Sequence, residues 1–428
     1  MIASWEAPPL LQSKAVPDQS SNRARRLSVL LALVALVGCA GIPPCPARGG
    51  PTWHEVASDN FALATNLRGD DGLDMLASLE NLRWSILAAT FSGEVDRAGR
   101  VNVWLLGEDE WDDMFSRNYR GLFSRSSLLG AAIIVPDDDI FSQAIVKHEL
   151  AHYVLDAYIK EQPRWFGEGM AQYLETIEYR RAENDAVVTV GAWAPYRTYY
   201  RSDLFNPSPT NLLRTSEMLA APQRRVRENP EREQRFYTTA WLMIQYLVNT
   251  HRDGLAAYER DLIAGVDPNL AFARRFPDLS GSKFDVGLYA FANQGAHLVR
   301  EFHIPPPAYT TQTRVLSEAE LHTIRARIDA AADTSSALEP NARLARIAAN
   351  LDEAEAADPL YLDALALDLA VLGRPASPQT AHRLVAANPD NWLAWYVAAA
   401  AFSSSPDLAV AAAHARRKQI LLHPSSGK

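Results

Sequence analysis

Residues 147–175 read KHELAHYVLDAYIKEQPRWFGEGMAQYLE, and this stretch decides how the rest of the chain is interpreted. It contains the pattern H-E-x-x-H at His148, Glu149 and His152, followed by Glu168 between two glycines. Residues four apart in an α-helix lie only about 40° apart around its axis, so the two histidines would point the same way from neighbouring turns. Two imidazoles placed in this way can bind one Zn²⁺.

A catalytic zinc ion takes three protein ligands and keeps one position for water, so a third ligand is needed. Glu168 is the best candidate. We expect Pro163 to end the first helix and Glu168 to lie on a second helix that folds back, with Gly167 and Gly169 permitting a close backbone approach. The alternative is that both histidines are ordinary surface or core residues and that Glu168 is an acid favoured near a helix N-terminus.

The segments HELAHYVL and PRWFGEGMAQYLE together resemble the gluzincin clan of zinc metallopeptidases, in particular its bacterial peptidase MA-like members. The resemblance covers roughly residues 53–293, but only the 29-residue core is specific. It implies that His148, His152 and Glu168 are zinc ligands and that Glu149 is the general base. No Gly-x-Met-Glu-Asn motif that would anchor a substrate amine is present, so an aminopeptidase is not supported.

The same resemblance suggests two further roles. Many clan members hydrogen-bond the oxyanion through a downstream tyrosine, and Tyr237 in FYTTAWLMIQYL matches that position. Its alternative is a packed aromatic, and Tyr196, Tyr199 and Tyr200 are rivals. Residues 128–135, LLGAAIIV, would match the edge strand that pairs with an extended substrate backbone.

Periodicity along the body of the chain predicts an α+β fold of the zincin-like type, with a small mixed sheet packed against active-site helices. Short strands are expected within residues 52–67, and further strands at 101–106 and 128–135. Apolar residues at helical spacing predict helices over 70–91 and 234–252. The catalytic domain is therefore assigned to residues 52–302.

Residues 303–315 are Pro-rich and are interpreted as a linker to an all-α region at 316–428. Pro359, Pro389 and Pro424 recur at intervals of 30 and 35 residues before Ala-rich helices. This pattern resembles degenerate tetratricopeptide repeats, which would offer a surface for a protein partner. A plain helical bundle is the alternative.

The N-terminus resembles a bacterial lipoprotein signal. Three arginines precede an apolar run from Leu27 to Val37, which is too short to span a membrane, and Gly38-Cys39 follows. Residues 1–38 are interpreted as the signal peptide, Cys39 as the lipidated residue and 39–51 as a tether. By analogy, Ala40 favours the outer membrane facing the periplasm. Cys45 is the only other cysteine, which excludes a disulfide-stapled fold.

Composition narrows the function. The chain has 428 residues, 48% of them hydrophobic, and a net charge of -9, which argues against a nucleic-acid partner. The leading hypothesis is a zinc-dependent peptidase of the endopeptidase type, lipid-anchored in the envelope and acting on peptide or protein substrates. One alternative is an envelope scaffold lipoprotein with little or no catalysis. Another is a metal-dependent hydrolase that acts on cell-wall material.

Overall fold

The computed structural model describes residues 44–67, 69–91, 99–115, 121–126, 130–136, 144–183, 185–192, 212–221, 229–279, 281–294, 298–332 and 336–422. The predicted signal peptide, Cys39, Pro424 and the rival tyrosines Tyr196, Tyr199 and Tyr200 lie outside these ranges. Strands and helices are mixed in the first part of the chain, and the last part is helical. The predicted α+β class is therefore confirmed.

A six-stranded mixed sheet has the order β4-β5-β3-β2-β1-β9. Strands β2 and β3 are parallel, whereas β4 and β5 form an antiparallel pair in which Ser126 lies opposite Gly130. All five residues of β2 are buried, which explains why it is apolar on both faces. The strands are β1 (His54–Ala57), β2 (Phe61–Thr65), β3 (Val101–Leu106), β4 (Leu122–Ser126), β5 (Gly130–Pro136) and β9 (Gln312–Val315).

The prediction that residues 128–135 form an edge strand is wrong. Strand β5 does form there, but it lies between β4 and β3. Its outer hydrogen-bonding groups are taken by β4, so β4 is the end strand on that side of the sheet. An extended substrate therefore cannot add to β5 without displacing β4.

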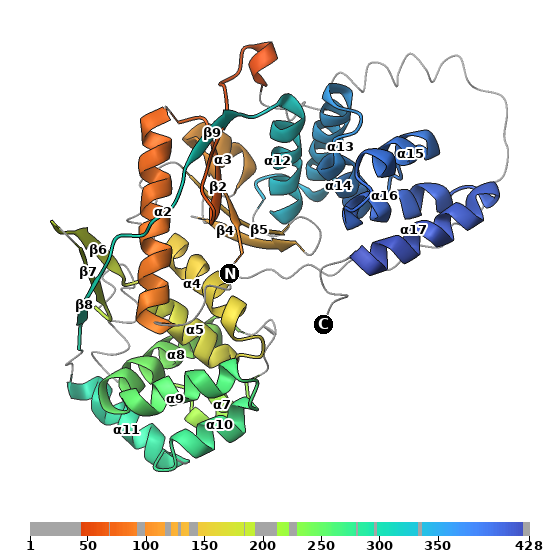
Figure 1. The fold of residues 1–428 in the computed structure, drawn as a ribbon. Helices are drawn as coiled ribbons and strands as arrows, with labels where there is room; N and C mark the ends of the chain where they lie inside the picture. Colours follow the sequence, from red (N-terminus) through yellow and green to blue (C-terminus); the bar gives the residue numbers. More distant parts are fainter. Residues whose placement is uncertain are drawn as a thin grey trace. The chain divides into compact units, whose positions relative to one another are not determined.

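One compact unit comprises Glu55–Leu105 and Val135–Arg314. Its long helix α2 packs against β2 and α4, and α5 packs against α4 and α8 (Figure 1). A second, antiparallel sheet has the order β6-β7-β8. The elements are α2 (Gly69–Thr90), α4 (Ala144–Tyr158), α5 (Arg164–Leu174), β6 (Glu178–Arg181), β7 (Ala186–Val190), α7 (Thr215–Leu219), α8 (Pro230–Thr250), α9 (Arg252–Ile263), α10 (Pro268–Arg275), α11 (Ser282–Gln294) and β8 (Arg300–Ile304).

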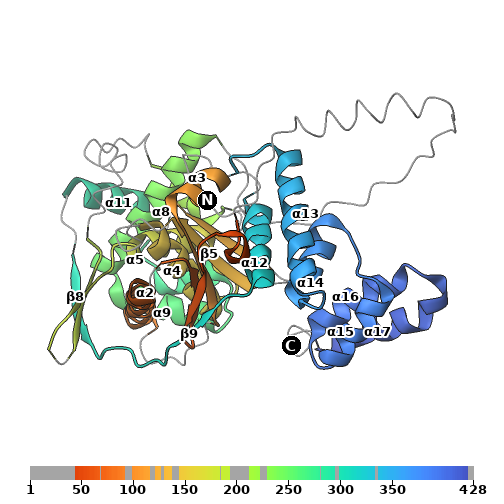
Figure 2. The ribbon, with the colours of Figure 1, turned by 90° about the horizontal axis from the view of Figure 1, so that it is seen from above.

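Among the described residues, the other compact unit combines residues 44–54, Leu106–Ile134 and the chain from Val315 to Leu422. Helices α14 and α16 begin 30 residues apart; α13 packs on α14, α14 on α16, and α16 on both α15 and α17 (Figure 2). Its helices are η1 (Pro46–Arg48), α3 (Glu108–Met114), α12 (Glu318–Ala331), α13 (Pro340–Ala357), α14 (Leu362–Leu372), α15 (Pro378–Ala387), α16 (Trp392–Ser403), η2 (Pro406–Leu408) and α17 (Ala409–Leu422).

These units do not follow chain order, since three separate stretches build the second one. The segment predicted as a linker, residues 303–315, carries the end of β8 and the whole of β9, so both of its ends belong to sheets. Among the described residues, no helix has the length and apolarity that crossing a membrane requires.

Candidate metal centre

Helix α4 carries the H-E-x-x-H pattern, as predicted. His148, Glu149 and His152 are buried, with exposed fractions of 8%, 2% and 6%. Leu150, Ala151 and Leu155 of the same helix are buried as well, so α4 is enclosed on several sides. Both imidazoles are therefore fixed in a site of low dielectric, where charge interactions are stronger than in water.

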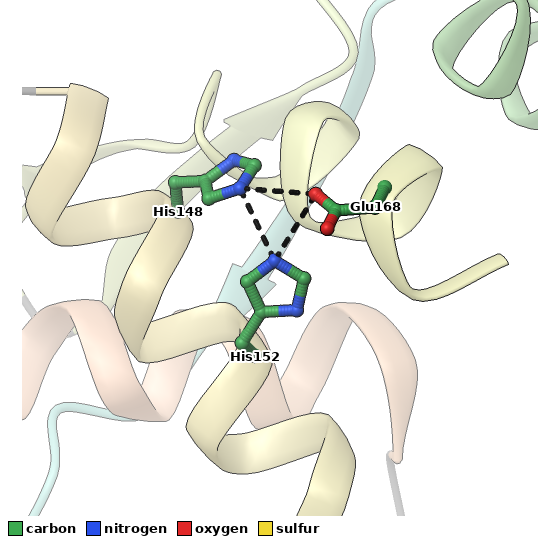
Figure 3. A group of neighbouring side chains, drawn as sticks. All are labelled: His148, His152 and Glu168. Atoms are coloured by element: carbon green, nitrogen blue, oxygen red, sulfur yellow. Dashed lines mark hydrogen bonds and ion pairs between the residues drawn. The ribbon is translucent and has the colours of Figure 1, made fainter. Parts of the chain in front are cut away.

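Helix α5 brings Glu168 to the two histidines. Pro163 lies between the helices and is the N-cap of α5. Every residue of α5 is buried, and Trp165 packs against Tyr258 and Phe272. Figure 3 shows the result: the two histidines project from one helix, Glu168 projects from the other, and the three side chains point toward one another.

The three side chains have the spacing of a tetrahedral metal site. The Nε2 atoms of His148 and His152 are 3.1 Å apart, and Glu168 Oε2 lies 3.6 Å from the first and 3.4 Å from the second. Two ligands bound at about 2.1 Å to a tetrahedral zinc ion would be about 3.4 Å apart. Among the described residues, this is the group of His, Cys, Asp and Glu that could hold a metal ion.

Glu175 was not predicted as part of the site, yet it contacts the first histidine. Its Oε2 lies 3.1 Å from His148 Nδ1, and its exposed fraction is 2%. A carboxylate can only accept here, so Nδ1 carries a hydrogen, and Nε2 is left as the nitrogen that can bind a metal ion once it has lost its proton. Glu175 follows Glu168 by seven residues, about two helical turns, so it lies on the same face of the helix, and this spacing is the one local signal that connects it with the site.

The charges within the site are strongly coupled. Burial by itself lowers the pKa of His148, but the hydrogen bonds to Glu168 and Glu175 outweigh it and raise the pKa to about 9. Burial acts to raise the pKa of Glu168, but the two histidines hold it well below its usual range. The site therefore attracts positive charge, which either a proton or a metal ion can supply.

Glu149 lies beside the ligands and is free to act on a bound molecule. Its Oε2 is buried and has no hydrogen-bond partner among the described residues. A buried carboxylate oxygen without a hydrogen bond destabilises the folded protein. A molecule bound beside the metal position would give this oxygen a hydrogen-bond partner. The unpaired Oε2 of Glu149 is consistent with a metal site in which this oxygen hydrogen-bonds to a molecule in the fourth, open coordination position.

Close packing of α5 on α8 depends on a glycine. A Cβ at Gly169 would lie 2.5 Å from the carbonyl oxygen of Ala240, whereas one at Gly167 would meet only the Gln162 side chain at 3.0 Å. The predicted close approach is therefore found at Gly169. Asp156, one turn after His152 on α4, accepts a hydrogen bond from Gln162.

Gln172 connects Glu168 with Tyr237. Its Nε2 donates to the backbone carbonyls of both residues, at 3.0 and 3.1 Å. These two hydrogen bonds hold the backbone of Tyr237 close to the turn of α5 that carries Glu168. The Tyr237 side chain is half-buried, and its ring contacts Phe236 and the guanidinium of Arg164. The role of its hydroxyl stays a prediction.

A family profile described as a protein of unknown function, DUF1570, matches residues 142–264. The match begins just before α4 and ends just after α9, so it includes His148, Glu149, His152, Glu168 and Glu175. It covers less than a third of the chain. No curated protein matches the chain.

Proposed function

We propose that this protein is a zinc-dependent peptidase held to the bacterial envelope by a lipid on Cys39. The observation that carries the catalytic part is the convergence of His148, His152 and Glu168 beside the unpaired carboxylate oxygen of Glu149. Two imidazoles and one carboxylate, with a fourth position open, are a donor set typical of catalytic zinc.

The site residues have separable tasks in this proposal. A bound zinc ion would lower the pKa of a water molecule and polarise the scissile carbonyl. Glu149 takes the proton of the attacking water and passes it to the amine nitrogen as the C–N bond breaks. Glu175 keeps the hydrogen of His148 on Nδ1, so that Nε2 faces the ligand position. Tyr237 is assigned a hydrogen bond to the carbonyl oxygen of the scissile bond.

The envelope part of the proposal rests on the sequence alone. Arginines, a short apolar run and Gly38-Cys39 have the layout of a lipoprotein signal. The helical region from α12 to α17 is assigned to contacts with a protein partner, because stacked helix pairs with a 30-residue period build extended binding surfaces.

Cleavage of an unbiased peptide mixture tests the catalytic part. The wild type is compared with Glu149→Gln and with Glu178→Gln, a matched change at an exposed residue of β6. All three proteins are loaded with zinc, and the zinc content of each is measured alongside cleavage. We expect equal zinc in all three, cleavage by the wild type and Glu178→Gln, and a loss of at least 100-fold in Glu149→Gln.

The other outcomes select an alternative. If all three proteins hold zinc and none cleaves peptides, the peptidase proposal fails and the scaffold hypothesis gains support. Release of products from cell-wall material under the same conditions would instead indicate a hydrolase of another substrate class. If Glu149→Gln cleaves as fast as the wild type, Glu149 is not the base.

A further inference from the structure

Residues 44–50, called the strap here, form a tight turn within the segment predicted to be a tether. The amides of Arg48 and Gly50 both donate to the carbonyl of Cys45, at 2.8 and 3.1 Å. Gly49 has a φ of +87°, which favours glycine, and a Cβ at Gly50 would lie 1.8 Å from the carbonyl oxygen of Pro44. The chain therefore enters and leaves the strap at nearly the same point.

The strap is docked on α12 and α13, whose residues lie far along the chain. The Ala47 amide donates to Glu318 on α12 at 3.0 Å. Arg48 Nη2 pairs with Glu353 on α13 at 2.5 Å. Both views of the ribbon show η1 beside the N-terminal end of α12 (Figures 1 and 2). Each contact joins segments more than 270 residues apart.

A buried thiol completes the docking. Cys45 has an exposed fraction of 2%, and its Sγ lies 3.0 Å from His322 Nε2. His322 Nδ1 lies 2.9 Å from the Asn350 amide oxygen, which can only accept, so Nε2 is left to accept from the Cys45 thiol. Arg325 Nη1 donates to the same sulfur at 3.4 Å. Removing Cys45 would leave these buried groups without their partner, which opposes release of the strap.

We infer that the strap holds the α12–α13 end of the helical region close to the lipid surface. The inference rests on the lipidation of Cys39 in the proposed function. Five peptide units join Cys39 to Pro44, so the chain between them spans at most about 18 Å. Without docking, free chain would extend to Trp53, which is buried, and the reach would rise to about 50 Å.

The inference is that the N-terminal end of α12 and the neighbouring end of α13 stay near the lipid surface, without inserting into the bilayer. Glu318 and Glu320 place negative charge on the first turn of α12, which does not favour binding to anionic lipids. The lipid on Cys39 supplies the attachment, and the strap sets how far from it the helices can move. The class of partner is therefore a bilayer surface reached through the N-terminal anchor.

Fluorescence quenching in vesicles tests the inference. The full chain carrying Ala357→Cys is produced in a bacterium, labelled with a fluorophore and reconstituted into phosphatidylethanolamine–phosphatidylglycerol vesicles containing a headgroup quencher. Ala357 is exposed and lies one turn beyond Glu353, whereas Cys45 is buried and Cys39 is blocked by lipid, so the label is directed to position 357. We expect strong quenching, reduced at least threefold when 20 Gly/Ser residues are inserted after Ala40.

A second variant separates the strap from the length of the tether. Arg48→Ala combined with His322→Ala should reduce quenching in the same direction and increase the rate of Cys45 alkylation at least tenfold. Arg417→Ala, a change at an exposed residue of α17, should alter neither. Both insertion and substitution leave the metal-binding residues untouched, so zinc content serves as a check of folding.

The outcomes distinguish this inference from the proposed function. If mass spectrometry finds no lipid on the N-terminal peptide, the proposed anchoring fails and the inference fails with it. If the lipid is present but quenching is weak, or is unchanged by the insertion and by strap release, the inference alone is overturned. Loss of peptide cleavage in any of these experiments would bear on the catalytic proposal only.

Discussion

Substituting Gly169 tests whether the metal site depends on the close approach of α5 to α8. In Gly169→Ala, the new Cβ would lie 2.5 Å from the Ala240 carbonyl oxygen and 2.7 Å from Ile244 Cγ1. Since a Cβ ordinarily keeps 3.4 Å or more from such atoms, the helices must separate by about 0.9 Å. Metal–ligand distances tolerate only about 0.2 Å, and Glu168 is the adjacent residue, so zinc binding should weaken.

Gly167→Ala is the matched control for this prediction. Replacing glycine by alanine in a helix stabilises the folded state by about 1 kcal/mol at either position. Only Gly169→Ala also introduces a steric clash, which destabilises the folded state by about 1–3 kcal/mol. The Gly167 variant meets only the flexible Gln162 side chain. We expect the Gly169 variant to be less stable than the control by about 1–3 kcal/mol, or about 2–4 °C in Tm per kcal/mol.

The assay is thermal unfolding of the metal-free proteins together with zinc titration against a competing chelator. The predicted result is a lower Tm and at least tenfold weaker zinc binding for Gly169→Ala relative to Gly167→Ala. Equal stability and equal zinc affinity in the two variants would refute the reasoning, because it would show that α5 shifts without disturbing Glu168.

Three further predictions concern the site and the helical region. Glu175→Gln should weaken zinc binding about 10–100-fold in chelator competition, whereas the exposed control Glu178→Gln should leave it unchanged; equal affinities would refute the role of Glu175. Because His148 has a pKa of about 9 without metal, zinc must displace its proton, so zinc affinity should rise about tenfold per pH unit toward pH 9 and then level off; an affinity independent of pH between 7 and 9 would contradict this. Arg346→Leu should destabilise the protein by about 3–5 kcal/mol in denaturant unfolding, since it leaves the fully buried Asp329 carboxylate without its main cation, and a double variant with Asp329→Leu should recover most of the loss; a single variant as stable as wild type would refute the pairing.

Local patterns in the sequence were sufficient to predict which three side chains form the candidate metal centre. The four-residue spacing of His148 and His152 fixes their common face once a helix forms, and Pro163 separates the two helices. Glu168 follows from the need for a third ligand. Glu175 was not predicted, although it lies two turns beyond Glu168, because its contact with His148 depends on how α4 and α5 cross.

Contacts between segments far apart in the chain could not be predicted from local sequence patterns. Strand β4 has only five residues, so its pairing with β5, which removes β5 from the edge, was not predicted. The docking of residues 44–50 was also missed, because a short Pro/Gly-rich stretch has no hydrophobic period. Its contacts are polar and involve α12 and α13, far along the chain, and no local pattern identifies such partners.

X-ray absorption at the zinc edge of the purified, zinc-loaded protein tests the central claim most directly. The account predicts one zinc per chain, bound by two imidazole nitrogens and by oxygen at about 2.0–2.2 Å, with no sulfur ligand. The imidazole signal should fall by half in His152→Ala. A protein that takes up no zinc, or a spectrum of oxygen ligands alone that His152→Ala leaves unchanged, would contradict the assignment of His148, His152 and Glu168 as the metal site.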